Sequence, residues 1–385
     1  MSKRAAATVA TTAPMVKMNR VDLVAALQNI AKVVRPTRVE DVWNNVLATV
    51  VNGVMELRGT DTVATVVLKL PAESADEISF LIPRTLSSYI GHLSADEITL
   101  QINDGSVDVV DVTAGTSTAK IQTPPLAKVV EFPKPEVKEE TVSCVVPLTA
   151  LRAAVDTVAF AKAAREDAKP QFMGIHFAGT AGESILRLGA TDNRVAAAAQ
   201  CPTSEPLSAD VSAVFFPQIQ DALDLIVDEK VEMRISGRQV QMACDNLEIT
   251  VALIGFQFPD VRKFLAAEDL GQVTVDKGLV LGALGRAEIV ATQNDKDIIL
   301  DMTENALTIS AKTDLGSITD TIAVTNGPTV RLRLGTHFLK QAVRAMAKGD
   351  QVTLRFYGEA KPVWVASPQD DKAFAWVMPM RQPSN

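Results

Sequence analysis

The sequence is poor in the side chains from which reactive sites are most often built. Among 385 residues it has 3 cysteines, 3 histidines and 2 tyrosines. Cys144, Cys201 and Cys244 are an odd number without metal-ligand spacing. This favours small buried side chains in a reducing compartment over disulfides or a zinc site. The histidines are far apart in sequence, which favours structural or solvent-facing roles.

Long apolar runs and a positive net charge are also missing. No segment is apolar enough to cross a bilayer, and 47% hydrophobic residues is ordinary for a globular chain, so we expect a soluble, cytoplasmic protein. The net charge of −8 argues against wrapping on nucleic acid by bulk attraction, although it leaves room for a local basic surface. The Ala- and Thr-rich segment 1–17 lacks the features of a secretory signal and is predicted to be a disordered extension.

One unit recurs three times in the sequence. It begins with an amphipathic helix, continues through a short polar turn and ends in a strand of alternating character. Its copies are "IPRTLSSYIGHLSADEITLQI" (82–102), "FPQIQDALDLIVDEKVEMRI" (216–235) and "LGTHFLKQAVRAMAKGDQVTLRF" (334–356). Such a repeat predicts an array of similar domains in a chain too long for one core.

A second type of helix recurs about as regularly. In its first copy Leu23, Leu27 and Ile30 lie on one apolar stripe. The copies cover residues 18–34, 146–163 and 275–292. Between the helices lie period-2 segments that predict half-buried antiparallel strands, since successive side chains of a strand point to opposite faces. Examples are the segments 53–60, 184–191 and 306–313.

These elements predict an α+β fold of three similar domains, each with two helices packed on antiparallel sheets. The segment "PKPEVKEE" (133–140) has prolines and charges but no apolar face, so it is predicted to be a linker. The predicted organisation is an extension at 1–17 and domains at 18–138, 139–268 and 269–385.

Basic residues gather on or beside the repeated helices. Lys340, Arg344 and Lys348 are four residues apart, which predicts one stripe along the last helix. Further basic residues in or just after earlier helices are Arg35, Arg38, Arg152, Lys162, Arg165 and Lys169. Any single cluster is also explained by a solvated helix face or by a favourable interaction with the helix dipole. The helix from Pro217 is acidic, which argues against a uniformly basic surface. The pattern as a whole suggests a local basic surface.

No motif for catalysis is recognisable. The sequence lacks a glycine-rich phosphate loop, a nucleophile elbow, a His/Cys cluster and an acidic metal loop. Two predicted strands end in a Thr-Asp pair, Thr60-Asp61 and Thr191-Asp192. Paired carboxylates could act as acid and base, but their equivalent places in successive repeats favour a turn role, in which Asp bonds local backbone groups. We therefore expect neither an enzyme nor a cofactor or metal site.

Taken together, these features resemble the beta sliding clamp family of bacterial DNA polymerase III. The likeness runs from about Met18 to Arg381 and depends on the repeat, the two Thr-Asp strand ends, "AKPQFMGIHF" (168–177), "FQFPDVRKFL" (256–265) and the terminal "VMPMR". It implies a homodimeric ring around duplex DNA, lined by helices. A ring around a duplex about 20 Å across needs about a dozen helices at 8–10 Å spacing. Two chains with six helices each would supply them.

The resemblance also implies a function and a set of sites. The chain would be a non-catalytic processivity factor at the nucleoid, without a cofactor. It would slide on double-stranded DNA through phosphate contacts and bind the replicative polymerase, the clamp loader and other proteins through tails of the Gln-Leu-x-Leu-Phe type. Residues implied for the partner-peptide pocket are Phe172, Thr191, Arg194, Val195, Pro259, Phe264, Val363, Val377, Met378, Pro379, Met380 and Arg381. Residues implied to face DNA are Arg35, Arg38, Arg152, Gln171, Lys340, Arg344 and Lys348. Those implied at the dimer seam are Ile121, Ile289 and Val290.

Two departures from the family pattern affect the pocket. The family usually has Thr-Asp-Gly-His/Tyr-Arg-Leu where this chain has "TDNRVA", so either Arg194 or Val195 could fill the pocket-lining place. Gly335 and Phe338 stand where an Asn and a Tyr are common. The specificity of the pocket is therefore expected to differ from the common type.

Two other functions stay open at this point. One is a scaffold of the same fold that binds proteins and seldom loads on DNA, supported by the acidic helix at 217–228. The other is a hydrolase using Asp61 and Asp192, for which no nucleophile or metal site is evident.

Overall fold

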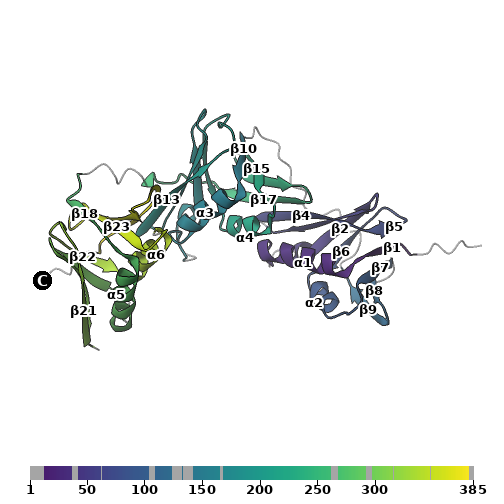
Figure 1. Ribbon diagram of the computed structural model, residues 1–385. Coiled ribbons are helices and arrows are strands. Elements are labelled where there is room, and N and C mark those ends of the chain that lie inside the picture. Colours follow the sequence, from purple (N-terminus) through teal and green to yellow (C-terminus); the bar gives the residue numbers. More distant parts are fainter. Residues whose placement is uncertain are drawn as a thin grey trace, which may run out of the picture. The chain divides into compact units, whose positions relative to one another are not determined.

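The computed structural model describes most of the chain. The described residues are 13–36, 42–61, 63–103, 109–123, 132, 142–164, 168–261, 268–291, 297–314, 316–346 and 348–380. The chain forms two compact units. The first comprises residues 1–139 with 224–227 and 241–252, and the second comprises 140–223, 228–240 and 253–385. Each unit is described separately below, with the elements labelled as in Figure 1.

In the residues that the structure describes, the first unit has two helices and two antiparallel sheets. The helices are α1 (Arg20–Val33) and α2 (Leu86–Gly91), and a 3-10 turn covers Val42–Asn44. One sheet has the order β5 (Glu73–Ser74), β1 (Met15–Asn19), β7 (Glu97–Asn103), β8 (Val109–Ala114) and β9 (Ser117–Gln122). The other has the order β4 (Ala64–Pro71), β3 (Val54–Thr60), β2 (Asn45–Val51) and β6 (Ile78–Pro83). Residues 247–251 of β17 (Leu247–Ile254) pair with β4.

Helix α1 follows from its sequence. The Asn19 side chain caps it, since Oδ1 accepts hydrogen bonds from the N–H groups of Val21 (2.8 Å) and Asp22 (3.2 Å). The predicted stripe of Leu23, Leu27 and Ile30 is buried, and α1 packs against β3 and β4. Burial of this stripe fixes the end of α1 beside the end of β3.

The second unit contains a long antiparallel sheet and a separate four-stranded one. The long sheet has the order β18 (Gly271–Asp276), β23 (Gln351–Phe356), β24 (Val363–Ser367), β25 (Asp370–Val377), β13 (Val195–Pro202), β12 (Ile185–Thr191), β11 (Ile175–Gly179) and β14 (Val211–Phe215). The four-stranded sheet has the order β21 (Gly316–Ala323), β20 (Ala306–Thr313), β19 (Asp297–Met302) and β22 (Val330–Gly335). Beside them β10 (Val142–Pro147) pairs with β15 (Lys230–Ile235). The remaining strand is β16 (Gln239–Cys244). The β25–β13 pair crosses the domain boundary predicted at 268, and the three predicted domains stay a prediction. The prediction that the disordered extension reaches residue 17 is wrong for residues 15–17, because they belong to β1, where Val16 is buried between β5 and β7.

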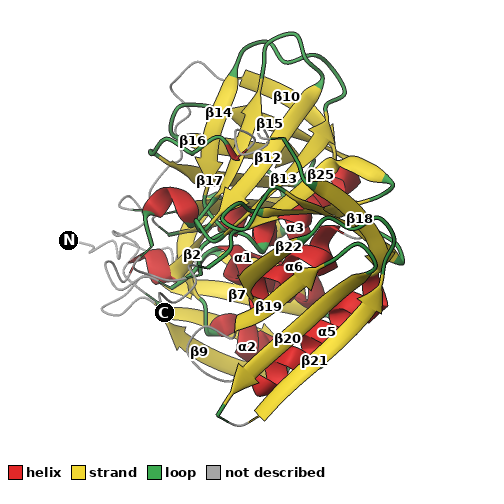
Figure 2. Ribbon diagram, turned by 90° about the vertical axis from the view of Figure 1, so that its left-hand side faces the viewer, coloured by secondary structure: helices red, strands yellow, loops and turns green. Residues whose placement is uncertain are grey.

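The predicted helices are present with one correction. They are α3 (Leu148–Ala159), α4 (Gln218–Leu225), α5 (Lys277–Val290) and α6 (Thr336–Met346). Figure 2 shows α5 running along β20 and β21, against which it packs. Because α6 ends at Met346, the prediction that Lys348 continues its basic stripe is wrong. Lys348 lies in the turn before β23, next to Gly349 and Asp350, which favour a turn over a further helical turn.

The cysteines mostly behave as predicted from the sequence. All three are free thiols, and Cys144 and Cys201 are buried while Cys244 is half-buried. Burial raises the pKa of the Cys144 thiol to about 11 and, together with nearby Cys144, that of Cys201 to about 12. Both therefore stay protonated and unreactive near neutral pH. No helix in the described ranges has the length and hydropathy needed to span a membrane.

Candidate functional site

The apolar end of the chain is explained by strand pairing. β25 lies between β13 and β24, where Val377 is opposite both Val195 and Val363. Trp376 and Val377 are fully buried. The prediction that these two residues complete the last strand is confirmed.

Beyond the strand lies the tail, residues 378–380. Backbone hydrogen bonds hold it at two points. The Met378 N–H donates to the Arg194 carbonyl (2.8 Å), and the Met380 N–H donates to the Arg333 carbonyl on β22 (2.8 Å). Met378, Pro379 and Met380 are half-buried. Part of each methionine side chain is therefore accessible for contact with another molecule. Arg381 lies outside the described residues.

The turn between β12 and β13 lies next to the tail, because its Arg194 carbonyl accepts the Met378 N–H. Asp192 Oδ1 accepts hydrogen bonds from the N–H groups of Arg194 (2.8 Å) and Val195 (2.9 Å). The Thr191 hydroxyl donates to the Val195 carbonyl (2.8 Å), and Asn193 has a left-handed backbone with φ of 73°. Asn tolerates this conformation better than most residues. The turn role predicted for the Thr-Asp pairs is confirmed here.

The turn also separates Val195 from Arg194. Val195 is buried in β13, whereas Arg194 is exposed and its guanidinium lies 6.0 Å from the centroid of the Phe338 ring. The Arg194 carbonyl is the group that binds the tail. Of the two candidates for the pocket-lining place, Val195 is buried and Arg194 is exposed beside the tail. No local pattern connects Phe338 or Arg333 with this turn, because both are far from it in the chain.

The remaining residues predicted for the partner-peptide pocket are scattered. Phe172 is buried in the 3-10 turn Pro170–Phe172, where its carbonyl accepts a hydrogen bond from the Ala163 N–H (2.7 Å). Pro259 is exposed and lines a different cavity. Phe264 lies outside the described residues. The pocket assignment therefore stays a prediction, strongest for the tail, the Thr191–Val195 turn and Val363.

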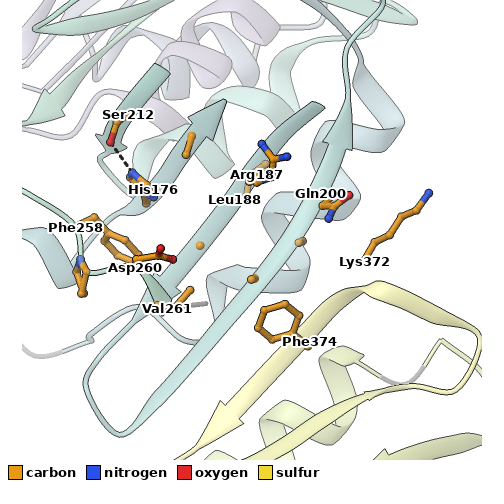
Figure 3. A pocket seen from close by; sticks show the side chains of 15 residues that line it. His176, Arg187, Leu188, Gln200, Ser212, Phe258, Asp260, Val261, Lys372 and Phe374 are labelled. Carbon is orange, nitrogen blue, oxygen red and sulfur yellow. Dashed lines mark hydrogen bonds between the residues drawn. The ribbon is translucent and has the colours of Figure 1, made fainter. Parts of the chain in front are cut away.

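The cavity that Pro259 lines lies on one face of the long sheet (Figure 3). Its volume is about 260 Å³. Phe374 on β25 and Phe258 form apolar walls, and Arg187, Gln200 and Lys372 contribute polar ends. A volume of this size holds one or two side chains, less than the roughly 300–1,000 Å³ typical of small-molecule sites.

Two polar side chains of this cavity, those of His176 and Arg187, have hydrogen-bond partners within the protein. The His176 ring stacks on Phe258 at 4.6 Å between centroids, and its Nε2 lies 3.0 Å from the Ser212 hydroxyl. Arg187 Nη1 donates to Glu183 (2.5 Å), and this hydrogen bond raises the pKa of the guanidinium. Of the described residues predicted for the partner-peptide pocket, this cavity contains Pro259 and no other, so it does not support that prediction.

Residues predicted to face DNA differ in their surroundings. Arg35 and Arg344 are exposed, and Gln171 is half-buried. Lys340 is paired with Glu288 on α5 (2.5 Å), and Lys348 with Asp370 (2.6 Å). Both pairs reduce the net positive charge that these lysines present.

Arg152 also has an intramolecular partner. Its Nε and Nη2 donate to the Leu223 carbonyl near the end of α4, at 3.2 and 2.6 Å. A cation at a helix C-terminus interacts favourably with the helix dipole. Arg152 thus has a structural role beside any contact with DNA, and Arg38 lies outside the described residues.

The residues predicted for the dimer seam are accessible. Ile289 on α5 is 74% exposed, and Leu279 on the same helix is 57% exposed. Val290 and Ile121 are half-buried, and Ile121 lies on β9, an edge strand of its sheet. Large apolar side chains with this exposure on one helix are typical of a surface that another chain covers.

Comparison with known proteins agrees with the fold. The beta sliding clamp of Haemophilus influenzae is 25% identical over 374 residues, which are 94% of this chain and 99% of that protein. The beta sliding clamp of Caulobacter vibrioides is 24% identical over 213 residues, and this match spans only 57% of its length. The solved Pseudomonas aeruginosa sliding clamp bound to griselimycin is 22% identical, with a TM-score of 0.87 over 96% of this chain and 100% of that one.

Two family models match separate parts of the chain. The model described as "DNA polymerase III beta subunit, N-terminal domain" matches residues 15–133, and "DNA polymerase III beta subunit, C-terminal domain" matches residues 262–381. Together they cover more than half of the chain and include both the first repeated helix and the tail. The chain therefore belongs to the DNA polymerase III beta subunit family, the beta sliding clamps.

Proposed function

We propose that this protein is a DNA sliding clamp. It encircles duplex DNA without reading its sequence and tethers the replicative polymerase, the clamp loader and other partners through their peptide tails. It has no catalytic activity of its own and acts in the cytoplasm at the nucleoid. Family membership supports the general role, and the surfaces described above support its parts.

The main structural support for the proposal is the tail. Met378 and Met380 are held in place by backbone hydrogen bonds to Arg194 and Arg333 but keep accessible side-chain surface. Methionine adapts its shape to different apolar ligands. Apolar residues of a partner peptide would contact this surface, while the exposed Arg194 would bind a polar group beside them.

Contacts with DNA would come from a small number of cations. Arg35 and Arg344 are exposed in the two units. Contacts of this kind go to phosphates and carry no sequence information, so a ring can slide from one to the next. The intramolecular pairs of Lys340 and Lys348 and the net charge of −8 would keep the grip on the phosphate backbone weak.

Ring closure would require two chains. In the seam, Ile289 and Val290 on α5 of one chain would pack near Ile121 on β9 of the other. Burial of the exposed Ile289 side chain would contribute about 1.5–3 kcal/mol per seam. In analytical ultracentrifugation at micromolar concentration we expect a dimer for the unaltered protein and a monomer for Ile289→Glu. A monomeric unaltered protein would contradict the ring.

Topological loading tests the function directly. The protein is loaded by a clamp loader onto nicked circular DNA, and the DNA is then linearised. A clamp stays on the circle and slides off after cutting. A conventional DNA-binding protein would remain on the linear DNA.

The second candidate is a protein-binding scaffold of the same fold that seldom loads on DNA. It is favoured by the acidic side of α4, with Asp221 and Asp224, and by the intramolecular pairing of Lys340 and Lys348. In the loading experiment a scaffold never becomes associated with the circle, although it still binds partner peptides.

A further inference from the structure

The first unit contains a small polar cluster at the end of α1 that the proposed function does not explain. Its members are Asp61, at the end of β3, and Arg84, just after β6. Both bind the backbone that leads from α1 into the segment with Arg35. Two charged side chains from separate strands thus meet at one short stretch of backbone.

Asp61 uses both carboxylate oxygens. Its Oδ1 accepts hydrogen bonds from the N–H groups of Val63 (2.7 Å) and Ala64 (2.7 Å), which closes the turn after β3. Its Oδ2 accepts one from the Arg35 N–H (2.8 Å). One carboxylate therefore joins a rigid strand end to the backbone of an exposed arginine.

Arg84 binds backbone carbonyls that lie before and after Arg35 in the chain. Its Nη1 donates to the Val34 carbonyl (2.6 Å), and its Nη2 donates to the Trp43 carbonyl (3.4 Å). The planar guanidinium fork can span two carbonyls in this way, whereas a lysine ammonium cannot reproduce its geometry. Burial lowers the pKa of Arg84, and nearby Asp61 opposes that shift.

Close packing adds rigidity beside these hydrogen bonds. A Cβ at Gly59 would lie 2.2 Å from Cγ2 of Ile30 and 3.8 Å from Cγ2 of Val34. The β3 backbone thus lies directly against the last turn of α1, and a larger residue would push the two apart. The end of α1 has little freedom to move relative to Asp61.

We infer that Asp61 and Arg84 are positioning residues for DNA contact by Arg35, holding its backbone at a fixed place at the end of α1. This inference rests on the proposed function. A side chain with a fixed backbone gives up less conformational freedom when it binds a phosphate, which strengthens the interaction.

The test compares the salt dependence of DNA binding among variants. Affinity for a short fluorescent duplex is measured by anisotropy at several salt concentrations. Arg35→Ala should reduce the slope of log K against log salt by about 0.9 for each phosphate that the variant no longer neutralises. Asp61→Asn keeps one oxygen for the turn but puts an amide group opposite the Arg35 N–H. It should reduce the slope as Arg35→Ala does.

The double variant separates positioning from general destabilisation. If Asp61 acts through Arg35, adding Asp61→Asn to Arg35→Ala should change the slope no further, whereas independent effects would add. Arg84→Lys should behave as Asp61→Asn does. The matched control is Asp210→Asn, which alters an aspartate of the other unit whose Oδ1 likewise accepts a backbone N–H, that of Ala181 (2.8 Å), and it should leave the slope unchanged.

Two results would overturn the inference, and they differ in what they say of the proposed function. If Arg35→Ala reduces the slope but Asp61→Asn and Arg84→Lys do not, the positioning role is wrong and the clamp function stands. If Arg35→Ala leaves the slope unchanged, Arg35 does not bind a phosphate. The proposed DNA contact then fails together with the inference.

Discussion

The turn at Asp61 and the turn at Asp192 have the same local structure but hold different parts of the molecule. In each, one aspartate oxygen accepts two backbone N–H groups, from Val63 and Ala64 in the first and from Arg194 and Val195 in the second. The preceding threonine hydroxyl also bonds within each turn. The Thr-Asp pair thus makes equivalent hydrogen bonds in successive repeats.

The two turns differ in their long-range partners. The Asp61 turn binds the Arg35 N–H through the second carboxylate oxygen, beside a predicted DNA contact. The Asp192 turn presents the Arg194 carbonyl to the Met378 N–H, beside the predicted peptide pocket. Local sequence therefore builds the turn, and the tertiary structure determines which segment docks on it. Each prediction below tests one side of this comparison.

The largest effect is expected where the tail docks beside the Asp192 turn. Removal of residues from Met378 onward deletes both tail hydrogen bonds and both methionines. We expect binding of a partner peptide to fall by about 100-fold or more, equivalent to about 3 kcal/mol. Fluorescence anisotropy with a labelled Gln-Leu-x-Leu-Phe peptide measures the decrease, and ultracentrifugation should show the same oligomeric state as the intact chain.

The control for the truncation removes only residues 382–385. This shorter deletion should bind the peptide as the intact chain does. If removal from Met378 dissociates the oligomer, the tail is part of the structural core. If it leaves peptide affinity unchanged, the pocket lies elsewhere, and the cavity beside Phe258 becomes the next candidate.

The next largest effect is expected beside the Asp61 turn. Gly59→Ala places a methyl group against Ile30, whose branched side chain has little freedom to move aside. Overpacking of this kind costs about 1–3 kcal/mol in the free energy of unfolding. Urea denaturation measures the change, followed by a probe in the first unit.

Gly91, at the end of α2, provides the matched control in the same unit. A Cβ there would meet no atom within 4 Å. Gly91→Ala should therefore be neutral or stabilise by about 0.4–1 kcal/mol, because alanine restricts the unfolded chain. An equal decrease of stability in the two variants would show that close approach of β3 to α1 is not the cause.

Much of the local structure could be predicted from the sequence. The strands β3, β12 and β20 follow the period-2 segments, and α1 follows its apolar stripe, since one buried face dictates each pattern. The end of α6 was predicted wrongly because basic residues at four-residue spacing continue past Met346 in a turn. Charge spacing does not distinguish a helix from a turn when no apolar face continues with it.

Less of the candidate site could be predicted from the sequence. The β25–β13 pair and the bond from Met380 to the Arg333 carbonyl join segments far apart in the chain. Neither leaves a periodic pattern that could predict its partner. The family resemblance predicted that the tail and the turn belong to the site, and it showed that Phe338 stands where the family usually has a Tyr. The places of Phe338 beside Arg194 and of Arg333 beside the tail emerged only from the tertiary structure.

A smaller effect is expected at the Asp192 turn itself. Asp192→Ala removes the acceptor for the Arg194 and Val195 N–H groups, which costs about 1 kcal/mol in stability. The Arg194 carbonyl is then no longer held in a fixed position, and we expect peptide affinity to fall about fivefold. Asp192→Asn keeps an acceptor oxygen and should recover most of the affinity. If both variants bind normally, the turn does not orient the tail.

The smallest effect is expected at Asp370, a third turn aspartate. Its Oδ1 accepts the Lys372 N–H (3.0 Å) and its Oδ2 accepts Lys348 Nζ (2.6 Å), but Lys348 is mostly exposed. Partial burial of Asp370 acts to raise its pKa, yet the bonds from Lys348 and Lys372 outweigh this and lower the pKa below its ordinary value. The stabilisation is therefore fully present above the unfolded-state pKa and disappears as pH falls through the lower folded-state value.

Asp370→Asn tests whether a turn whose long-range partner is an exposed lysine side chain stabilises the protein less than the other two turns do. Because solvent screens the Lys348 pair, we expect a decrease of less than about 1 kcal/mol in the free energy of unfolding at pH 7. The difference from the unaltered protein should shrink as the pH falls below the unfolded-state pKa of about 3.9. Urea denaturation across this range measures it. A decrease at pH 7 as large as that of Asp192→Ala would mean that a backbone long-range partner stabilises a turn no more than an exposed lysine side chain does.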